Sequence, residues 1–429
     1  MKKYSLPRGT SDILPDQMPL WESLESVSRK VFRLFNYKEI RTPFFEETDL
    51  FARSMGQTSD VVQKQMLNLA AQKRDDQHVI QLSGLSLRPE NTASVVRSYI
   101  QNGMDRKENL TKLFYIGPMF RGERPQKGRL RQFHQIGVEA IGPQTSAPFL
   151  DAEVVTLCVR LLNDFGVKGF KLKINTLGSQ EDKENFSKLL RKELAHKRVE
   201  LCQDCQLRYD RNVFRILDCK KKECQKIATA VNIDYQYLSD DSRKYYQEVK
   251  KSLDQLGILY TESPHLVRGL DYYTHLVFEI TCDALGSQNA IGAGGRYNSL
   301  VSQLGGPVVD AVGFALGLER IILARDAGEP GKQSGVDLYL IAMDAACQNR
   351  VFQMMNDLRA KEISCEMSYR LSSVKSQMRA ANKARAKWVA ILGDEELKKN
   401  MVALKNMDSG QQTQIRQTDI RKYIFDNTA

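Results

Sequence analysis

The segment "FRGERPQKGRLRQFHQ", residues 120–135, predicts a β-hairpin built around positive charge. TKLFYIGPMFR before its tip and RQFHQIGVEAIG after it are typical of strands, and Pro125 and Gly128 between them are typical of a loop. Glu123 alone opposes five cationic side chains: Arg121, Arg124, Lys127, Arg129 and Arg131. The segment is therefore either a solvated basic loop or a hairpin shaped to bind a ligand with several negative charges.

Strand periodicity predicts which of these side chains lie together. Arg121 and Glu123 point to one side of the first strand. Alternation on the return strand puts five residues on one face: Arg131, Phe133, Gln135, Gly137 and Glu139. Burying such a face without a ligand is costly, whereas Arg binds phosphate oxygens bidentately and an aromatic ring can stack on a base. A nucleotide suits this face, although a solvated sheet with ordinary salt bridges remains the alternative.

Composition sets the broad class. The chain has 429 residues, 42% hydrophobic and 27% charged, which is typical of a globular protein of two or three domains. We expect no membrane span, because no apolar run reaches the roughly 18 residues needed. The N-terminus lacks the apolar region of a secretory signal, so we expect a cytoplasmic protein. The net charge of +11 permits a polyanionic partner without choosing one.

The pattern along the chain predicts two domains. Strand-like and helical segments alternate over residues 1–328, and a lysine-, acid- and cysteine-rich stretch at about 180–255 indicates a helical insertion. ARDAGEPGKQSGVD, residues 324–337, has the composition of a linker. Strands and helices alternate again over residues 335–429, which indicates a separate α/β domain.

Three further segments could line a pocket. In LSLRPENTAS, Asn91 or Thr92 could simply cap a helix, or Glu90 and Thr92 could bind an ammonium group. LVRGLDYYTHLVFE and GFALGLERI place arginines in apolar surroundings, which suits a pocket wall, although a solvated strand face or a surface ion pair would explain them too. The glycines of AGGRYNSL allow a close ligand approach or a plain turn. Neither glycine-rich phosphate-loop motif occurs.

Taken in order, these segments resemble the class II aminoacyl-tRNA synthetases, and among them the histidyl-tRNA synthetase family. RGTSDILP is similar to that family's N-terminal signature, EIRTPFFE to motif 1, FRGERPQKGRLRQFHQIGVE to motif 2 and GFALGLER to motif 3. LVRGLDYYT and AGGRYNSLV resemble its two histidine-specific segments. The resemblance implies an α+β catalytic domain on an antiparallel sheet flanked by helices, with a helical insertion and a C-terminal α/β anticodon-binding domain.

The resemblance also implies roles for individual residues. Arg121 and Arg268 would be catalytic, on opposite sides of the α-phosphate of ATP. The histidine-binding residues would be Glu90, Asn91, Thr92, Arg121, Gln135, Glu139, Arg268, Tyr272, Tyr273 and Tyr297. The ATP-binding residues would be Arg121, Glu123, Arg129, Phe133 and Arg320. Mg²⁺ would accompany ATP, tRNA for histidine would be the second substrate, and motif 1 would form a homodimer interface.

Basic residues suggest where tRNA binds. Lys127 and Arg129 lie in the hairpin loop, and Lys375, Arg379, Lys383 and Lys387 recur every four residues, as a cationic stripe on a helix would. Such a stripe is often only solvated, but the resemblance to an anticodon-binding domain adds weight to contact with the tRNA backbone.

Four of the eight cysteines form a cluster with the spacing of a metal site: Cys202, Cys205, Cys219 and Cys224. They could hold a structural Zn²⁺ as four thiolates, or remain reduced thiols. The family's catalysis does not require zinc, so the two alternatives stay open.

Two rivals and two departures accompany the resemblance. A non-catalytic regulatory subunit of ATP phosphoribosyltransferase is similar in fold, but it lacks the C-terminal domain and tends to lose the arginines present here. A synthetase for another amino acid is disfavoured by the tyrosine pair and Glu139. Gly122 stands where the family has His or an aromatic residue, and Asn91 where glycine is more usual, which leaves the tuning of ATP or tRNA contacts open.

Overall fold

The computed structural model describes residues 3–57, 59–71, 81–143, 147–286, 289–325 and 335–427. The chain divides into two compact units, Met1–Gly328 and Glu329–Ala429. Most of the predicted linker at residues 324–337 lies outside the described residues. No helix in the described ranges combines the length and the apolar character needed to cross a membrane.

The first unit is built on an eight-stranded sheet in the order β1-β5-β6-β11-β10-β9-β7-β8. From β5 to β7 all neighbours are antiparallel, and the short edge strands β1 and β8 pair in parallel. The strands are β1 (Lys38–Glu39), β5 (Thr111–Phe120), β6 (Gln132–Gly142), β7 (Phe170–Thr176), β8 (Thr261–Glu262), β9 (Thr274–Cys282), β10 (Ala290–Arg296) and β11 (Asp310–Gly317).

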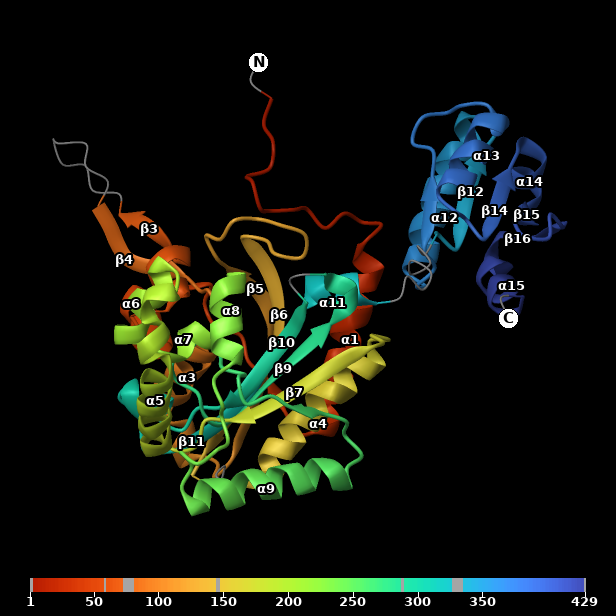
Figure 1. The fold of residues 1–429 in the computed structure, drawn as a ribbon. Coiled ribbons are helices and arrows are strands. Elements are labelled where there is room, and N and C mark those ends of the chain that lie inside the picture. The colour runs from red at the N-terminus through yellow and green to blue at the C-terminus, as the bar shows by residue number, and fades with distance from the viewer. Residues whose placement is uncertain are drawn as a thin grey trace. The chain divides into compact units, whose positions relative to one another are not determined.

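One face of this sheet packs on long helices. They are α1 (Met18–Leu34), α4 (Pro148–Asp164) and α9 (Asp240–Gln255). The short helix α11 (Leu318–Ala324) belongs to the same group. Helix α4 lies against the centre of the sheet, with α1 and α9 beside it (Figure 1). Their buried side chains, among them Phe32, Leu161 and Val249, form one apolar core with Val138 and Phe278 of the strands.

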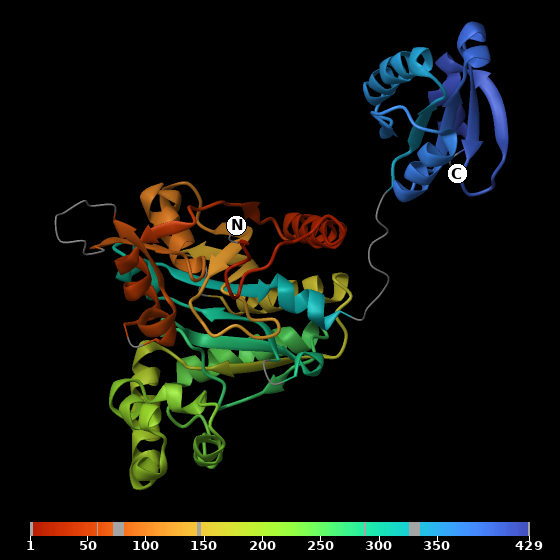
Figure 2. The same cartoon turned by 90° about the horizontal axis from the view of Figure 1, so that it is seen from above.

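The opposite face carries a second group of helices and the candidate site. These helices are α3 (Thr92–Gln101), α5 (Gln180–Leu194), α6 (Gln203–Arg211), α7 (Phe214–Leu217) and α8 (Lys222–Thr229). Figures 1 and 2 both show α5 to α8, in yellow-green, gathered at the end of the sheet away from α1. The predicted insertion at about 180–255 is therefore split between the two faces of the sheet. Helices α5 to α8 lie on this face, whereas α9 packs on α4 on the other face.

A small three-stranded sheet borders this second face. Its order is β2-β4-β3, and its strands are β2 (Phe45–Glu47), β3 (Leu67–Ala71) and β4 (Gln81–Leu87). Helix α2 (Thr48–Met55) follows β2, and α10 (Leu300–Gln303) follows β10. Phe51 and Met55 of α2 pack on Ala93 at the start of α3. This packing fixes the N-terminus of α3 beside the sheet.

The β5–β6 pair is the predicted hairpin. Its register pairs Met119 with Phe133 and Gly117 with Gln135, so the return strand presents its odd-numbered residues on one face. The backbone N–H of Arg121 then donates to the carbonyl of Arg131 at 2.8 Å. Residues 121–131 form the connecting loop.

The second unit is a separate α/β domain with a five-stranded sheet ordered β13-β12-β14-β15-β16. Its strands are β12 (Leu338–Ala342), β13 (Cys365–Met367), β14 (Trp388–Leu392), β15 (Met401–Asn406) and β16 (Gln412–Arg416). Its helices are α12 (Ala345–Arg359), α13 (Val374–Lys383), α14 (Asp394–Lys399) and α15 (Ile420–Asp426). Helices α12 and α15 pack on one side of the sheet and α13 on the other.

The predicted cationic stripe is shorter than four residues. Helix α13 ends at Lys383, so Lys387 lies beyond it and pairs with Asp337 at 2.8 Å. Lys375, Arg379 and Lys383 remain on the helix as exposed side chains. The four-residue spacing continues past the end of the helix, because a repeat of basic residues does not indicate where a helix ends.

Candidate active site

A cavity of about 620 Å³ opens on the sheet face opposite α4. Its walls come from the β5–β6 hairpin, β9, β10, β11, the N-terminus of α3, and the segment 267–273. Thirteen of the residues predicted to bind histidine, ATP or tRNA line it: Glu90, Thr92, Arg121, Glu123, Arg129, Phe133, Gln135, Glu139, Arg268, Tyr272, Tyr273, Tyr297 and Arg320. Residues far apart in the sequence therefore meet in one place.

Other residues predicted to bind histidine or tRNA lie outside this cavity. Asn91 is buried beneath it, and Lys127 is exposed in the loop of the hairpin. Lys375, Arg379 and Lys383 belong to the second unit.

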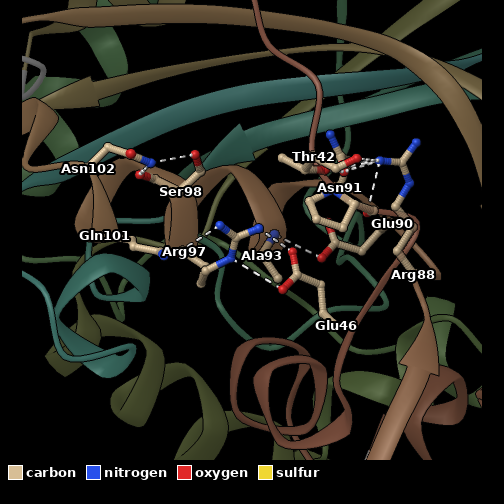
Figure 3. A network of polar contacts seen from close by, with 11 residues as sticks. Thr42, Glu46, Arg88, Glu90, Asn91, Ala93, Arg97, Ser98, Gln101 and Asn102 are labelled. Carbon is tan, nitrogen blue, oxygen red and sulfur yellow. Dashed lines mark hydrogen bonds and ion pairs between the residues drawn. The ribbon is translucent and has the colours of Figure 1, made fainter.

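Asn91 has a structural place rather than one in the cavity wall. Its Oδ1 accepts hydrogen bonds from the Thr42 hydroxyl at 2.7 Å and from Arg88 Nη1 at 3.2 Å (Figure 3). Arg88 also donates to the carbonyl of Thr42 at 3.0 Å. The side chain thus ties the segment before β2 to the start of α3, while its buried Nδ2 has no hydrogen-bond partner among the described residues. Contact between Asn91 and histidine stays a prediction.

Asn91 occupies the N-cap position of α3, as predicted, but Glu90 supplies the capping side chain. Its carboxylate accepts from the backbone N–H of Thr92 at 2.6 Å and of Ala93 at 3.0 Å. These N–H groups have no partner within the helix, and a carboxylate there also meets the positive end of the helix dipole. Burial nevertheless raises the pKa of Glu90. The carboxylate therefore lies in the cavity wall with its negative charge weakly compensated, which favours a cationic ligand group.

Arg121 forms a cationic wall with the ring of Phe133. Its Nε donates to the carbonyl of Pro89 at 2.9 Å, and its guanidinium carbon lies 5.2 Å from the ring centroid. The nearest contact with Glu123 is 4.0 Å, and Glu123 also pairs with Arg129. Burial lowers the pKa of Arg121. An anion in the cavity would offset that cost, since a buried guanidinium is stabilised by a charged partner.

Arg268 faces the cavity from the segment after α9. Its Nη1 pairs with the Glu279 carboxylate of β9, while its buried Nε has no hydrogen-bond partner among the described residues. Burial acts to lower the pKa of Arg268, but the carboxylate outweighs it and the pKa is raised. One edge of the guanidinium is therefore fixed, and its Nε–H is still without a partner.

Arg320 comes from α11, at the end of β11. Its Nε donates to the carbonyl of Gly128 at 3.1 Å and its Nη1 to that of Ala290. Burial, and then the charge of Arg129, lower the pKa of Arg320. The clustered positive charge makes this end of the cavity suited to phosphate groups.

Glu139 lies at the polar end of the cavity. It accepts from the Thr92 hydroxyl at 2.7 Å and from the Tyr297 hydroxyl. Burial raises its pKa to about 8 despite these two hydrogen bonds. Tyr272 packs against Tyr273 and Tyr297, with ring centroids 4.6 and 5.5 Å apart. The result is a small aromatic chamber with one carboxyl group at its base.

Two glycines, together called the glycine floor, lie at this chamber: Gly313 lines the cavity, and Gly137 lies against the hydroxyl of Tyr115, which lines it. A Cβ at Gly313 would overlap the Glu139 carboxylate and the carbonyl of Val138 on the neighbouring strand. A Cβ at Gly137 would overlap the Tyr115 hydroxyl in the same way. Only a residue without a side chain keeps the chamber open at these positions.

Some residues of the site were missed in the sequence. Glu279 pairs with Arg268, and its charge within the apolar strand HLVFEITC was a signal that could have found it. Lys183 of α5 donates to the carbonyls of Asp271 at 2.9 Å and Tyr273 at 2.8 Å, and so holds the tyrosine segment in place. Nothing in the sequence around Lys183 distinguishes it from neighbouring surface lysines.

Gly122 is at a point of close approach. Its N–H donates to the carbonyl of Gln65 at 2.7 Å, and a Cβ there would meet Leu67 at 3.3 Å. Gly122, which stands where the family has His or an aromatic residue, thus lies at a tight contact between the hairpin loop and β3.

An antiparallel sheet with an arginine-lined cavity, followed by a separate α/β domain, is the architecture expected of an aminoacyl-tRNA synthetase. The family model of histidyl-tRNA synthetase matches residues 9–321, and that of the anticodon binding domain matches residues 337–427. The chain belongs to the histidyl-tRNA synthetase family, and its predicted fold class is confirmed.

Individual relatives agree. The chain is 42% identical over 426 residues to the histidine--tRNA ligase of Lysinibacillus sphaericus, covering 98% of this chain and 99% of that protein. It is similar to the solved apo structure of the Staphylococcus aureus histidyl-tRNA synthetase, with a TM-score of 0.79, 35% identity and coverage of 98% and 100%. A structure described as an ATP phosphoribosyltransferase regulatory subunit/histidyl-tRNA synthetase from Bacillus halodurans C shares the fold, at a TM-score of 0.62 and 19% identity.

Proposed function

We propose that the chain activates L-histidine with ATP and transfers the histidyl group to the 3′ end of its tRNA. One observation carries this proposal: Arg121, Arg268 and Arg320 converge on a single cavity that also holds an aromatic chamber with a carboxyl base. The full-length relatives named as ligases favour this activity over that of a regulatory subunit.

The triphosphate would lie along the arginines. Arg121 and Arg268 would bind the α-phosphate from opposite sides, and Arg320 the γ-phosphate, with adenine stacked on Phe133. The histidine carboxylate attacks the α-phosphorus, an O–P bond forms, and the bond to the β-phosphate oxygen breaks to release pyrophosphate. Negative charge grows on the phosphoryl oxygens, so guanidinium groups held in advance would lower the barrier without a covalent enzyme intermediate.

Histidine would occupy the chamber at the other end. Glu90 and Thr92 lie at its edge and would bind the ammonium group. Glu139 with Tyr297, and Gln135, whose buried Oε1 has no hydrogen-bond partner among the described residues, would read the imidazole nitrogens. A chamber with fixed polar groups rejects a side chain that leaves them unpaired, which supports selectivity for a ring with two nitrogens.

Carboxylates in the cavity fit Mg²⁺. Glu279 and Glu319 both line it, and carboxylate oxygens together with substrate phosphates are the usual donors to this ion. We propose these two as the residues that would hold Mg²⁺, which supplies charge neutralisation on the phosphates. Glu319 is already oriented by the backbone N–H of His134, which donates to it at 2.9 Å.

The second unit would bind tRNA, and motif 1 would form a homodimer. Phe44 and Phe45, within the predicted motif, are 52% and 51% exposed, which is unusual for adjacent large apolar side chains and fits a covered surface. Light scattering of the purified protein would show a dimer, and Phe45→Asp would shift it toward monomer. A tRNA-charging enzyme works where translation occurs, so we expect it in the cytoplasm.

ATP–pyrophosphate exchange with a panel of amino acids tests the activity directly. Histidine alone should support rapid exchange, and the protein should then charge a transcript of tRNA for histidine. Exchange with another amino acid at a comparable rate, or none with histidine in active preparations, would overturn the proposal.

A further inference from the structure

The four clustered cysteines come together in space from three helices. Cys202 precedes α6, Cys205 lies in its first turn, Cys219 follows α7, and Cys224 lies in the first turn of α8. Their four sulfur atoms all lie within 4.8 Å of one another. A tetrahedral zinc with Zn–S bonds of about 2.3 Å requires sulfurs about 3.8 Å apart, so a contraction of at most about 1 Å completes the site.

The surroundings of the sulfurs suit thiolates. Three of the four side chains are buried, and Cys202 lies at the edge. The backbone N–H of Cys202 donates to Cys224 Sγ at 3.2 Å, a contact of the kind that stabilises a metal-bound thiolate. Four thiolates around Zn²⁺ leave two negative charges, and the cations Lys220 and Lys221 adjoin Cys219 in the chain.

The helices that carry these cysteines are short and polar, and their few buried apolar residues pack into the core shared with α5. Helix α6 has nine residues, and Cys205 is the only one that is buried. Helix α7 has four residues, of which Arg215 and Ile216 are buried. Short polar segments with so small an apolar interior usually need a metal or disulfides to stay folded. No disulfide joins any described cysteine, so a metal bound by the four sulfurs would add the one cross-link that packing and polar contacts do not supply.

These helices also form part of the cavity wall. Cys202 and Cys219 line the same cavity as Arg121 and Arg268. Asn212, between α6 and α7, donates to Asp271 Oδ1 at 2.7 Å, and Arg215 donates to the carbonyl of Gly269. Arg208 and Arg215 both pair with Asp60, at 2.9 and 2.7 Å. The cysteine cluster thus lies behind the contacts that place the segment 268–273.

We propose that Cys202, Cys205, Cys219 and Cys224 bind one structural Zn²⁺, which holds α6 to α8 together and so positions the segment carrying Arg268 and the tyrosine pair. Each thiol releases its proton to solvent as its sulfur binds the metal. The four cysteines are positioning residues and take no part in the reaction.

Metal analysis of full-length protein tests the site without reference to activity. Protein purified without chelator, or given Zn²⁺ under reducing conditions and then desalted, should retain one zinc per chain. The double variant Cys205→Ser, Cys219→Ser should retain less than about a tenth of that, since each lost thiolate weakens a four-ligand site. Cys347→Ala, in the second unit, is the matched control and should keep the full content.

Cobalt substitution and kinetics give independent readouts. Co²⁺ bound in place of zinc should give the intense thiolate charge-transfer and d–d bands of a tetrahedral Cys₄ site, and the milder variant Cys202→Ser should weaken them. Removal of zinc should raise KM for histidine and ATP at least about tenfold through the displaced segment and lower kcat less, because the reacting groups remain. Restoring zinc should recover KM.

Three results would overturn the proposal. The first is wild-type protein that neither contains zinc nor takes it up with its thiols reduced. The second is the double variant retaining wild-type zinc content. The third is thiol titration showing that Cys202, Cys205, Cys219 and Cys224 form disulfides in the active protein.

Discussion

Arg121 and Arg268 are held in place before any ligand arrives. Arg121 is fixed by the carbonyl of Pro89, and Arg268 by the carboxylate of Glu279. Preorganised cations lower a barrier because they need not rearrange as charge develops. Their side chains are each 22% exposed, so water screens them only in part.

Loss of Arg268 should therefore impair adenylation. Arg268→Ala should reduce the histidine-dependent ATP–pyrophosphate exchange rate by roughly 100- to 1,000-fold, as for loss of one donor to a developing anion. Arg198→Ala is a matched control, because Arg198 pairs with Asp210 on the surface. Exchange within about threefold of wild type in Arg268→Ala would remove the assigned role.

Glu139 should make stability depend on pH. Its pKa is about 8 in the folded chain against an ordinary 4.5, so between these values the folded state holds a proton that the unfolded state has lost. The contribution to stability is complete below pH 4.5 and is lost as pH rises through 8. Glu139→Gln removes this titration. Between pH 5 and pH 8.5 the unfolding temperature of the wild type should therefore fall by several degrees relative to that of the variant. A constant difference by calorimetry contradicts this.

Alternation along β6 was enough to place Phe133, Gln135 and Glu139 on one face, because the strand period is two and the hairpin is regular. Arg131, just before β6, departs from this alternation, because its Nε donates a hydrogen bond to the carbonyl of Glu123. Lys183 could not have been predicted, since its partners are backbone carbonyls nearly ninety residues away.

At the scale of elements, a fully buried ion pair joins β10 to α4. Arg296 and Asp151 have fully buried side chains, and Arg296 Nε donates to Asp151 Oδ1 at 3.0 Å. The Tyr245 hydroxyl of α9 donates to the same carboxylate at 3.1 Å. The Asp151 carboxylate of α4 thus connects strand β10 with helix α9.

Breaking this pair should destabilise the first unit strongly. Arg296→Met leaves Asp151 buried without its cation and should cost about 3–5 kcal/mol in urea unfolding, whereas replacing both residues with apolar ones should restore most of the loss. Arg160→Met is the control, since Arg160 pairs with Asp164 on the exposed side of α4 and should cost under about 1 kcal/mol. Equal costs for the two single variants would refute the argument.

The helical insertion shows which features of the fold sequence patterns do not predict. The helical character of residues 180–255 was visible in the sequence, but amphipathic periodicity does not say which sheet face a helix covers. Helix α9 buries Tyr246, Val249 and Leu253 against α4, while α5 buries Phe186 and Leu190 on the other side. That choice depends on tertiary packing, which no local pattern encodes.

At the scale of the molecule, the first unit contains the whole cavity, and the second unit offers a basic helix. Lys375, Arg379 and Lys383 of α13 are exposed, and none forms an ion pair with any described residue. The order of motifs predicted both the catalytic fold and the domain that follows it, because each motif belongs to a particular strand or helix of that fold.

Neutralising α13 should weaken tRNA binding through its salt dependence. The triple alanine variant of Lys375, Arg379 and Lys383 should lower the slope of log affinity against log salt by about 2, at roughly 0.7–0.9 per phosphate contact. Lys398→Ala with Lys399→Ala on α14 is the control, since those lysines already pair with Asp394 and Glu395. An unchanged slope in fluorescence titrations would show that the α13 residues are only solvated.

The glycine floor has a consequence for inhibitors of this protein. Any side chain at Gly313 would collide with Glu139, and any at Gly137 with Tyr115, so neither position has a substitute that keeps the chamber usable. A compound that binds against Gly313 should therefore be hard to escape by substitution there, because a side chain at that position would also disturb the carboxyl group proposed to bind histidine.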